Sequence, residues 1–199
     1  IGWRISYGVL GVAAIILIAA LLYLVRPDAE SLAARAKATR DASERPPEPL
    51  TERLAALARS RVFHALFWSF VICGFTTSGM IEVHLLPYAA ACGFPPLTSA
   101  TAYGVLAAFN MLGMVTAGYL ADRVNRPILL ASIYFFRGLA FILLFYIVGN
   151  TPVLFIFAVM FGVFDYSTVP ITASLVASHI GLRVMGLSMG ILTAGHSLG

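Results

Sequence analysis

Long apolar runs separated by short polar stretches are the feature that most constrains this chain. The first run covers residues 5–25, about the twenty residues with which a helix crosses a hydrocarbon core roughly 30 Å thick. Further runs of the same kind cover residues 62–91, 97–117, 127–148, 152–178 and 184–199. Because lipid offers the backbone no hydrogen-bond partners, such runs cross it as helices, and the sequence predicts an all-α membrane protein with about six transmembrane helices.

Composition and charge exclude several classes of protein. Hydrophobic residues make up 60% of the chain and charged residues 11%, whereas soluble domains hold about 45–50% apolar and about 25% charged residues. The formal net charge of +4 does not indicate a nucleic-acid partner, because basic and acidic residues are interleaved between apolar runs that face membrane lipid. Cys73 and Cys92 would lie about 28 Å apart along one helix, so we expect no disulfide, and we expect no metal site or cofactor.

Residues 27–61 differ from the apolar runs, because they mix acidic and basic side chains and contain the proline-rich stretch 45–49. We expect a solvated linker here. Near its end, Leu50, Leu54 and Leu57 recur at i, i+4 and i+7, which predicts a short surface helix with one apolar stripe.

Lysine and arginine gather on one side of the predicted spans, which sets their orientation by the positive-inside rule. The loops at residues 92–96 and 149–151 carry no basic residue. We therefore expect a multi-pass protein of the plasma or inner cell membrane, with residues 27–61, 118–126 and 179–183 in the cytoplasm. The basic residues on that side are Arg26, Arg35, Lys37, Arg40, Arg45, Arg53, Arg59, Arg61, Arg123, Arg126 and Arg183.

One of these predicted cytoplasmic loops carries a specific pattern. Its residues Gly118, Leu120, Asp122, Arg123 and Arg126 resemble the G-x-L-x-D-R-x-x-R signature of the major facilitator superfamily. In that family the signature joins the second and third helices of each half on the cytoplasmic side. The distribution of basic residues places the loop on the same side independently.

The resemblance implies a partial major facilitator fold, made of most of the C-terminal half-bundle plus the preceding helix. Residues 1–26 would be the last helix of the N-terminal half, and residues 27–61 the cytoplasmic central linker. Residues 62–199 would be the C-terminal helical half, cut before its last helix. The expected partners are a small-molecule substrate, membrane lipid and the missing N-terminal half of the same chain.

The family also implies a gating role for residues 118–126, which clamp neighbouring helix ends in one access state and release them in the other. We expect Asp122 to meet the start of the sixth span near residues 182–185, where the positive end of a helix dipole favours a carboxylate. Gly118 would allow close helix packing, and Arg123 and Arg126 would hold the loop on the cytoplasmic side. The alternative is a solvated turn with a helix cap.

A second likeness concerns the substrate. His84, Pro87, Tyr88 and Gly93 are similar to a segment in the monocarboxylate and oxalate/formate branches of the family, which implies a small organic acid. Those branches tend to carry an arginine in the following helix, and residues 97–117 contain no basic residue.

Two opposite charges lie at similar predicted depths in neighbouring spans. Arg137 is ten residues beyond Pro127, and Asp165 is thirteen residues beyond Pro152 on the way back. If the two spans form an antiparallel hairpin, these side chains can form a buried ion pair. The alternative for Asp165 is to line a cavity.

Other polar groups at membrane depth are candidates for a substrate or ion pathway, because they are costly in lipid unless they face a cavity or a partner. We expect Thr77, His84 and Tyr88 to share one helical face and Glu82 to lie on an adjacent one. The predicted pathway residues are Glu82, His84, Tyr88, Tyr103, Asn110, Asp165 and His196. The alternatives are an interhelical hydrogen bond for Asn110, a hydroxyl partner for His84 and simple solvation for Glu82.

Helix-disrupting residues predict two irregular spans. Gly79 and Pro87 should kink or partly unwind the outer half of the second span, and Pro170 should bend the fifth.

These features favour a secondary active transporter that moves a small solute by alternating access. The chain has no P-loop for ATP, so coupling to an ion or proton gradient, or exchange, is expected as in a symporter or antiporter. It has no H-E-x-x-H zinc motif, and we do not expect an enzyme. An efflux pump for apolar compounds and a non-transporting membrane scaffold or sensor remain the alternatives.

Overall fold

The computed structural model describes residues 12, 14–16, 18–19 and 49–199. The chain divides into two compact units, residues 1–49 and residues 50–199. Most of the predicted first span and of the linker lies outside the described residues. The second unit, described below, begins at Leu50 and therefore includes the end of the predicted linker.

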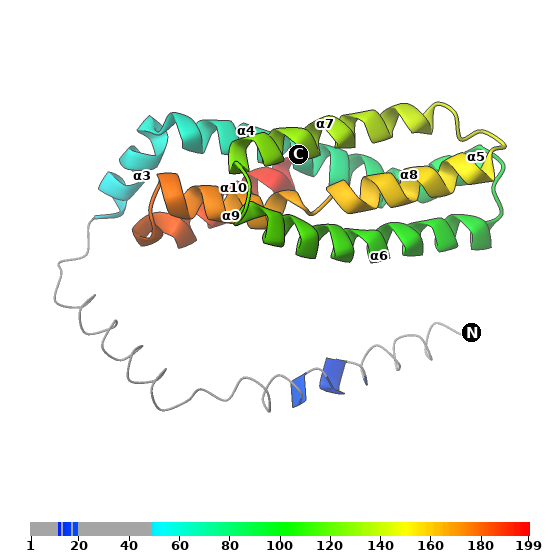
Figure 1. The fold of residues 1–199 in the computed structure, drawn as a ribbon, viewed down its shortest axis with the longest axis horizontal. Coiled ribbons are helices and arrows are strands. Elements are labelled where there is room, and N and C mark those ends of the chain that lie inside the picture. The colour runs from blue at the N-terminus through cyan, green and yellow to red at the C-terminus, as the bar shows by residue number, and fades with distance from the viewer. Residues whose placement is uncertain (1–11, 13, 17, 20–48) are drawn as a thin grey trace. The chain divides into compact units, whose positions relative to one another are not determined.

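The described part of the second unit is helical and contains no strand, which confirms the predicted all-α class (Figure 1). The short helix predicted near the end of the linker is present as α3. The elements are α3 (Leu50–Arg59), α4 (Arg61–Gly74), the π-helix η1 (Phe75–Glu82), α5 (Val83–Ala91), α6 (Pro96–Ala121), α7 (Arg126–Leu144), α8 (Thr151–Phe164), α9 (Thr168–His179), the 3-10 helix η2 (Leu182–Val184) and α10 (Met185–Leu198).

Four helical segments of the described part are long and apolar enough to cross a membrane. They are Arg61–Ala91, Pro96–Ala121, Arg126–Leu144 and Thr151–His179, and they match the second to fifth predicted spans with small differences at their ends. The sixth prediction corresponds to α10, which has 14 residues.

Local sequence signals fix where the helices begin. Side-chain oxygens of Ser60, Asn125 and Asn150 accept hydrogen bonds from the first turns of α4, α7 and α8. The turns that follow α5 and α7 need a left-handed backbone at Gly93 (φ 86°) and Gly149 (φ 64°), a conformation that glycine adopts without strain.

The second predicted span keeps a helical path throughout. Its irregularity is the π-helix η1, which contains Gly79, and Pro87 lies inside the regular helix α5. The outer half is therefore not unwound. A π-turn holds more residues than an α-turn, so η1 changes which side chains face the neighbouring helices.

The fifth predicted span breaks between α8 and α9 (Figure 1), one turn before Pro170. Proline has no N–H to donate to the carbonyl four residues earlier, and here that carbonyl belongs to Tyr166. The N–H of Val169 bonds to Tyr166 O instead, at 3.1 Å. The bend thus falls at Tyr166, whose carbonyl loses its usual donor, rather than at Pro170.

Two apolar clusters hold the bundle together, and a group of polar side chains lies between them. Along their own helices, Thr77, Asn110, Arg137 and Asp165 each fall between members of the first cluster and members of the second. The first cluster includes Leu66, Phe70, Ile133, Ile171 and Leu192, and the second includes Ile81, Leu106, Ala140, Leu154 and Phe161. A polar layer therefore separates the two cores.

Glycines allow the closest helix contacts. A side chain at Gly113 of α6 would overlap the carbonyl of Val163, and one at Gly162 of α8 would overlap that of Leu106. Gly118 does not serve this purpose as expected, because its nearest neighbour would be Pro170 Cβ at 3.9 Å, an ordinary contact distance. The signature glycine is thus not the residue that brings α6 and α8 together.

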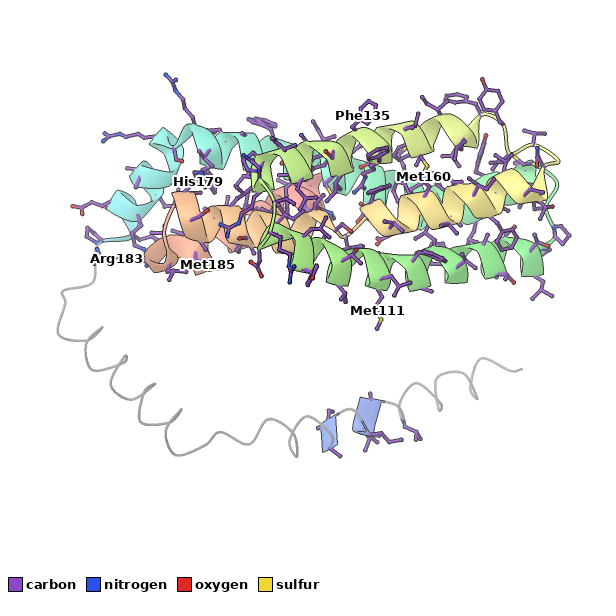
Figure 2. All side chains as sticks on the ribbon, in the orientation of Figure 1. Met111, Phe135, Met160, His179, Arg183 and Met185 are labelled. Atoms are coloured by element: carbon purple, nitrogen blue, oxygen red, sulfur yellow. The ribbon has the colours of Figure 1, made fainter. Side chains whose placement is uncertain are left out.

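The outward-facing surface of the bundle is apolar. Met111 on α6 is 70% exposed, Phe135 on α7 is 68% exposed, and both point away from the neighbouring helices (Figure 2). Large exposed apolar side chains of this kind suit contact with lipid.

A candidate functional site at two interrupted helices

Arg137 of α7 and Asp165 at the break form a buried ion pair. Arg137 Nη2 lies 3.1 Å from Asp165 Oδ1, and the two side chains are 2% and 4% exposed. Thr77 of η1 donates a hydrogen bond to the same Oδ1 at 2.7 Å and also contacts Arg137 Nη2. Removing one partner of such a pair costs about 3–5 kcal/mol, because the other charge stays buried.

The surroundings of this pair are closed. Cys73 Sγ accepts from Arg137 Nη1 at 3.1 Å, Thr168 Oγ1 lies 3.8 Å from the same sulfur, and both residues are buried. We call Cys73, Thr77, Arg137, Asp165 and Thr168 the buried set. The side chains of Asp165 and Thr168 are therefore buried inside the bundle.

Side chains also satisfy the backbone groups that the irregular helices leave free. Arg137 Nη1 donates to the carbonyl of Asp165 at 3.1 Å, and Nη2 donates to the carbonyl of Cys73 at 3.2 Å. The N–H of Tyr166 donates to Asn110 Oδ1 at 3.2 Å. Unpaired backbone groups cost several kcal/mol in lipid, so these side chains explain how a helix can break there.

Beside the buried set lies a more accessible group, formed by Glu82 of η1, Asn110 of α6 and Tyr166. The hydroxyl of Tyr166 donates to Glu82 Oε1 at 3.0 Å. Glu82 is exposed, whereas Asn110 and Tyr166 are half-buried. We call these three residues the accessible set. Glu82 and Asp165 are the only carboxylates inside the four described spans, and Glu82 is the one with no cationic partner there.

Tyr166 is absent from the residues predicted from the sequence. A signal for it exists, because Tyr166 stands four residues before Pro170 and so carries the carbonyl that the proline leaves without a donor. To recognise Tyr166 from the sequence, one would have to know that the helix breaks at this carbonyl. Whether Pro170 bends the helix or breaks it depends on hydrogen-bond partners from other helices.

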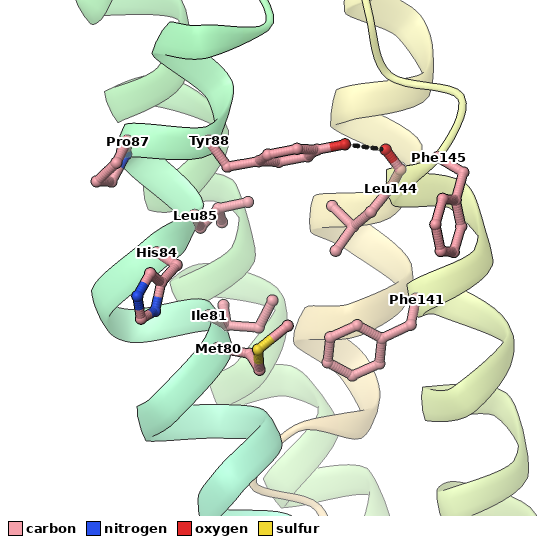
Figure 3. A pocket seen from close by; sticks show the side chains of 9 residues that line it. All are labelled: Met80, Ile81, His84, Leu85, Pro87, Tyr88, Phe141, Leu144 and Phe145. Atoms are coloured by element: carbon pink, nitrogen blue, oxygen red, sulfur yellow. Dashed lines mark hydrogen bonds between the residues drawn. The ribbon is translucent and has the colours of Figure 1, made fainter.

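The structure separates His84 and Tyr88 from Glu82, with which they were expected to form a pathway. Both line an apolar cavity of about 530 Å³ against α7, and Tyr88 Oη donates to the carbonyl of Leu144 at 2.8 Å (Figure 3). His84 Nδ1 lies 2.6 Å from the carbonyl of Gly79 in its own helix. The shared face predicted for Thr77, His84 and Tyr88 is wrong, because Thr77 is buried against Asp165.

Tyr103 and His196 lie apart from these contacts. Tyr103 on α6 is half-buried and forms no hydrogen bond with the described residues. The ring of His196 on α10 packs edge-on against Phe70, with 6.0 Å between ring centroids. Neither side chain bonds to Glu82 or Tyr166.

Comparison with known proteins decides the family. A model described as Major Facilitator Superfamily matches residues 1–199. The chain belongs to the major facilitator superfamily. A relative from Bacillus subtilis (strain 168), the "Uncharacterized MFS-type transporter YcxA", is 26% identical over 196 residues, which cover 96% of this chain and 45% of that protein. No solved structure matches.

Two conclusions follow from this match. The major facilitator chain spans about half the length of its curated relative. Its family, together with four apolar helices, makes it a membrane-embedded protein of a transporter family rather than an enzyme family.

The family's signature loop at residues 118–126 is closed on itself. Arg126 Nε donates to the carbonyl of Ala121 at 3.0 Å, and the guanidinium of Arg123 lies 4.1 Å from the ring of Tyr119. Asp122 is exposed and forms no hydrogen bond or ion pair with the described residues. The loop borders a groove of about 440 Å³ with Leu175 and His179 of α9.

The expected contact of Asp122 with residues 182–185 is therefore not formed in this structure. The carbonyl of Arg183 accepts a hydrogen bond from Arg53 Nη2 of α3 at 3.1 Å instead. The 3-10 helix η2, just before α10, is thus bonded to α3 at the end of the predicted linker.

One sequence pattern runs against the expectation that the chain is not an enzyme. Residues Gly186–Gly190 match G-x-S-x-G, in which Ser188 would be a nucleophile on a strand-to-helix turn. In this major facilitator chain Ser188 is fully buried within α10 and donates to the carbonyl of Val184 at 2.8 Å. No strand precedes it in the described residues, so the pattern has a helical, structural context.

Proposed function

We propose that the full-length protein is a secondary active transporter that moves a small solute by alternating access. The observation that carries this proposal is the contact, within the membrane-spanning segments, between the break of α8–α9 and the π-helix η1. Broken helices with free polar groups are where transporters place their binding sites. The accessible set supplies a carboxylate, a phenol and an amide at this position.

Glu82 is the proposed binding point for a proton or another cation that couples transport to a gradient. It is exposed and has no cationic partner among the described residues. Arg137 is the only arginine in the interior of a described span, and Asp165 already neutralises it. The interior of the described spans therefore offers a carboxylate solute no unpaired arginine, which favours a neutral or cationic solute over the organic acid expected from the second likeness.

A reconstituted transport assay tests the proposal. Full-length protein in proteoliposomes would be screened for uptake and exchange of amino acids, organic cations and carboxylates, with and without a pH gradient. Uptake that depends on the gradient, and that Glu82→Gln abolishes while exchange continues, is the expected result. If no compound is taken up or exchanged under any gradient, transport is rejected in favour of the scaffold or sensor alternative.

The signature loop provides a second element of the proposal, as a cytoplasmic gate that clamps neighbouring helix ends in one access state. Asp122 would reach the start of α10 only in that state. We expect Asp122→Asn to slow transport without reducing the amount of folded protein. An unchanged transport rate would eliminate the gate.

Transport of apolar compounds is a second candidate, favoured by the cavity of about 530 Å³ between η1, α5 and α7. Its lining is almost entirely apolar and includes Met80, Leu85, Phe141 and Phe145 (Figure 3). Phe141→Ala should then reduce transport of lipophilic compounds and leave polar solutes unaffected. Equal effects on both classes would argue against this use of the cavity.

A further inference from the structure

Tyr166 is held at both ends by other helices, at the point where α8 and α9 separate. Its backbone N–H donates to Asn110 of α6, and its hydroxyl donates to Glu82 of η1. The residue before it, Asp165, is fixed by Arg137 and Thr77. The break is thus attached through an ion pair on its buried side, and on its accessible side through Asn110 and through one phenol that meets a carboxylate.

We infer that Tyr166 is a positioning residue that transmits the charge state of Glu82 to the break between α8 and α9. This inference rests on the proposed function. Ionised Glu82 accepts a charge-assisted hydrogen bond from the phenol, and such bonds are roughly twice as strong as neutral ones. When Glu82 binds a proton, this bond weakens and α9 is free to change its angle relative to α8.

The geometry separates this role from simple packing. A tyrosine that only filled space would need no partner for its hydroxyl on the exposed side, where water can solvate it. Here the hydroxyl meets the one carboxylate of the described spans that has no cationic partner there. The phenol of Tyr166 therefore connects Glu82, whose charge can change, with the break between α8 and α9, whose angle can change.

Other ionisable groups surround Glu82 and must be controlled. On its own helix, His84 is bonded to the carbonyl of Gly79. On neighbouring elements, the ionisable groups near Glu82 are Asp165 and Tyr166 at the break, Tyr103 on α6 and His196 on α10. Arg137 on α7 is paired with Asp165 and belongs to the same group. His196 is the one most able to produce a competing pH response near neutrality.

Pulsed electron–electron resonance on the full-length protein in lipid nanodiscs can test the link. Spin labels at Arg61→Cys and Ser178→Cys, both at exposed positions, report the distance between the inner ends of α4 and α9. Cys92 would be replaced by serine, and buried Cys73 kept. The distance would be measured at about pH 4 and about pH 7, a window in which carboxyl groups titrate.

Three variants separate the possible causes. Glu82→Gln keeps an acceptor for the phenol but cannot change charge, and Tyr166→Phe removes only the donor. Tyr134→Phe is the matched control, because it loses an equivalent phenol hydrogen bond, to the carbonyl of Ser69 at 3.1 Å. We expect a pH-dependent distance shift in the parent protein and in Tyr134→Phe, and loss of that shift in Glu82→Gln and Tyr166→Phe.

Several results would overturn the inference. One is a parent protein whose label-to-label distance does not change with pH, and another is a Tyr166→Phe variant whose distance changes as in the parent. A third is loss of the pH-dependent change in Tyr134→Phe as well as in Tyr166→Phe. The last is a change that is lost in His196→Asn but kept in Glu82→Gln. If proteoliposomes take up solute while Tyr166→Phe still responds to pH, only the link fails. If the link holds but no solute is transported, the proposed function fails instead.

Discussion

Asp165 and Tyr166 are neighbours in the sequence, yet their side chains enter different environments. Asp165 belongs to the buried set, where a guanidinium and a hydroxyl occupy one of its oxygens. Tyr166 belongs to the accessible set, where one hydrogen bond reaches an exposed carboxylate. One break in a helix therefore has a side where opposite charges are buried together and a side that is open to change.

This difference in burial and pairing indicates that the buried set and the accessible set have different roles within the polar layer. A buried, paired charge is expensive to disturb, so we expect the buried set to keep the break in place when the rest of the bundle moves. An exposed carboxylate costs little to protonate or to move, so the accessible set is the part that can respond to a ligand. The predictions below test this division, from the largest expected change in stability to the smallest.

Arg137→Met should cause the largest loss. It leaves Asp165 charged and unpaired and removes the donors for the carbonyls of Cys73 and Asp165. We expect the free energy of unfolding to fall by about 3–5 kcal/mol, measured by denaturant titration in detergent micelles. Arg61→Met makes the same chemical change at an exposed helix start, and it should alter stability by less than about 0.5 kcal/mol. Similar losses in both variants would show that the buried set has no special role.

Asp165→Asn should have the next largest effect. The guanidinium of Arg137 loses its counterion, but the amide oxygen can still accept from Thr77 and from Arg137. The loss should therefore be smaller than for Arg137→Met, about 1.5–3 kcal/mol. Combined with Arg137→Met, the two losses should not add, and the difference should show a coupling of about 0.5–3 kcal/mol. Additive losses would mean that the two side chains do not act as a pair.

Asn110→Ala tests the backbone contact at the edge of the accessible set. It removes the acceptor for the N–H of Tyr166, and an unsatisfied donor there should cost about 1–3 kcal/mol. Because Asn110 is only half-buried, we expect a value near the lower end. Amide hydrogen exchange at Tyr166 should accelerate, while Thr116→Ala, which loses a hydroxyl contact on the same helix, should leave it unchanged. Equal protection in both variants would contradict the role of Asn110.

The sequence was sufficient to predict the helical class, four of the spans and the proximity of Arg137 and Asp165, because these depend on apolar length and on depth along a span. It was insufficient where helical geometry departs from the regular repeat. The π-helix η1 adds residues to a turn, so Thr77 was placed on the wrong face relative to His84 and Tyr88. The rise per residue is more robust to such irregularity than the rotation per residue.

Contacts made by the backbone could not be predicted from the sequence either. Pro170 marks the fifth span as irregular, but the break is set by which helices supply Asn110 and Arg137 to the freed groups. Tyr166 acquires its place only through that break. Similarly, the signature at residues 118–126 predicts a loop and a family, but the helix ends that the loop contacts depend on the conformation of the whole bundle.

Glu82→Gln should have the smallest effect on stability and a large effect on coupling. Glutamine still offers an oxygen to the hydroxyl of Tyr166, and residue 82 is exposed, so the free energy of unfolding should change by less than about 0.5 kcal/mol. Uptake driven by a pH gradient should fall to background while solute exchange continues, because the charge that the gradient acts on is gone. If Glu82→Gln unfolds as readily as Arg137→Met, Glu82 belongs with the buried set. If Glu82→Gln retains gradient-driven uptake, Glu82 has no role in the coupling step. Either result would erase the distinction between the two sides of the break, since that distinction depends on an accessible carboxylate whose charge can change without loss of the fold.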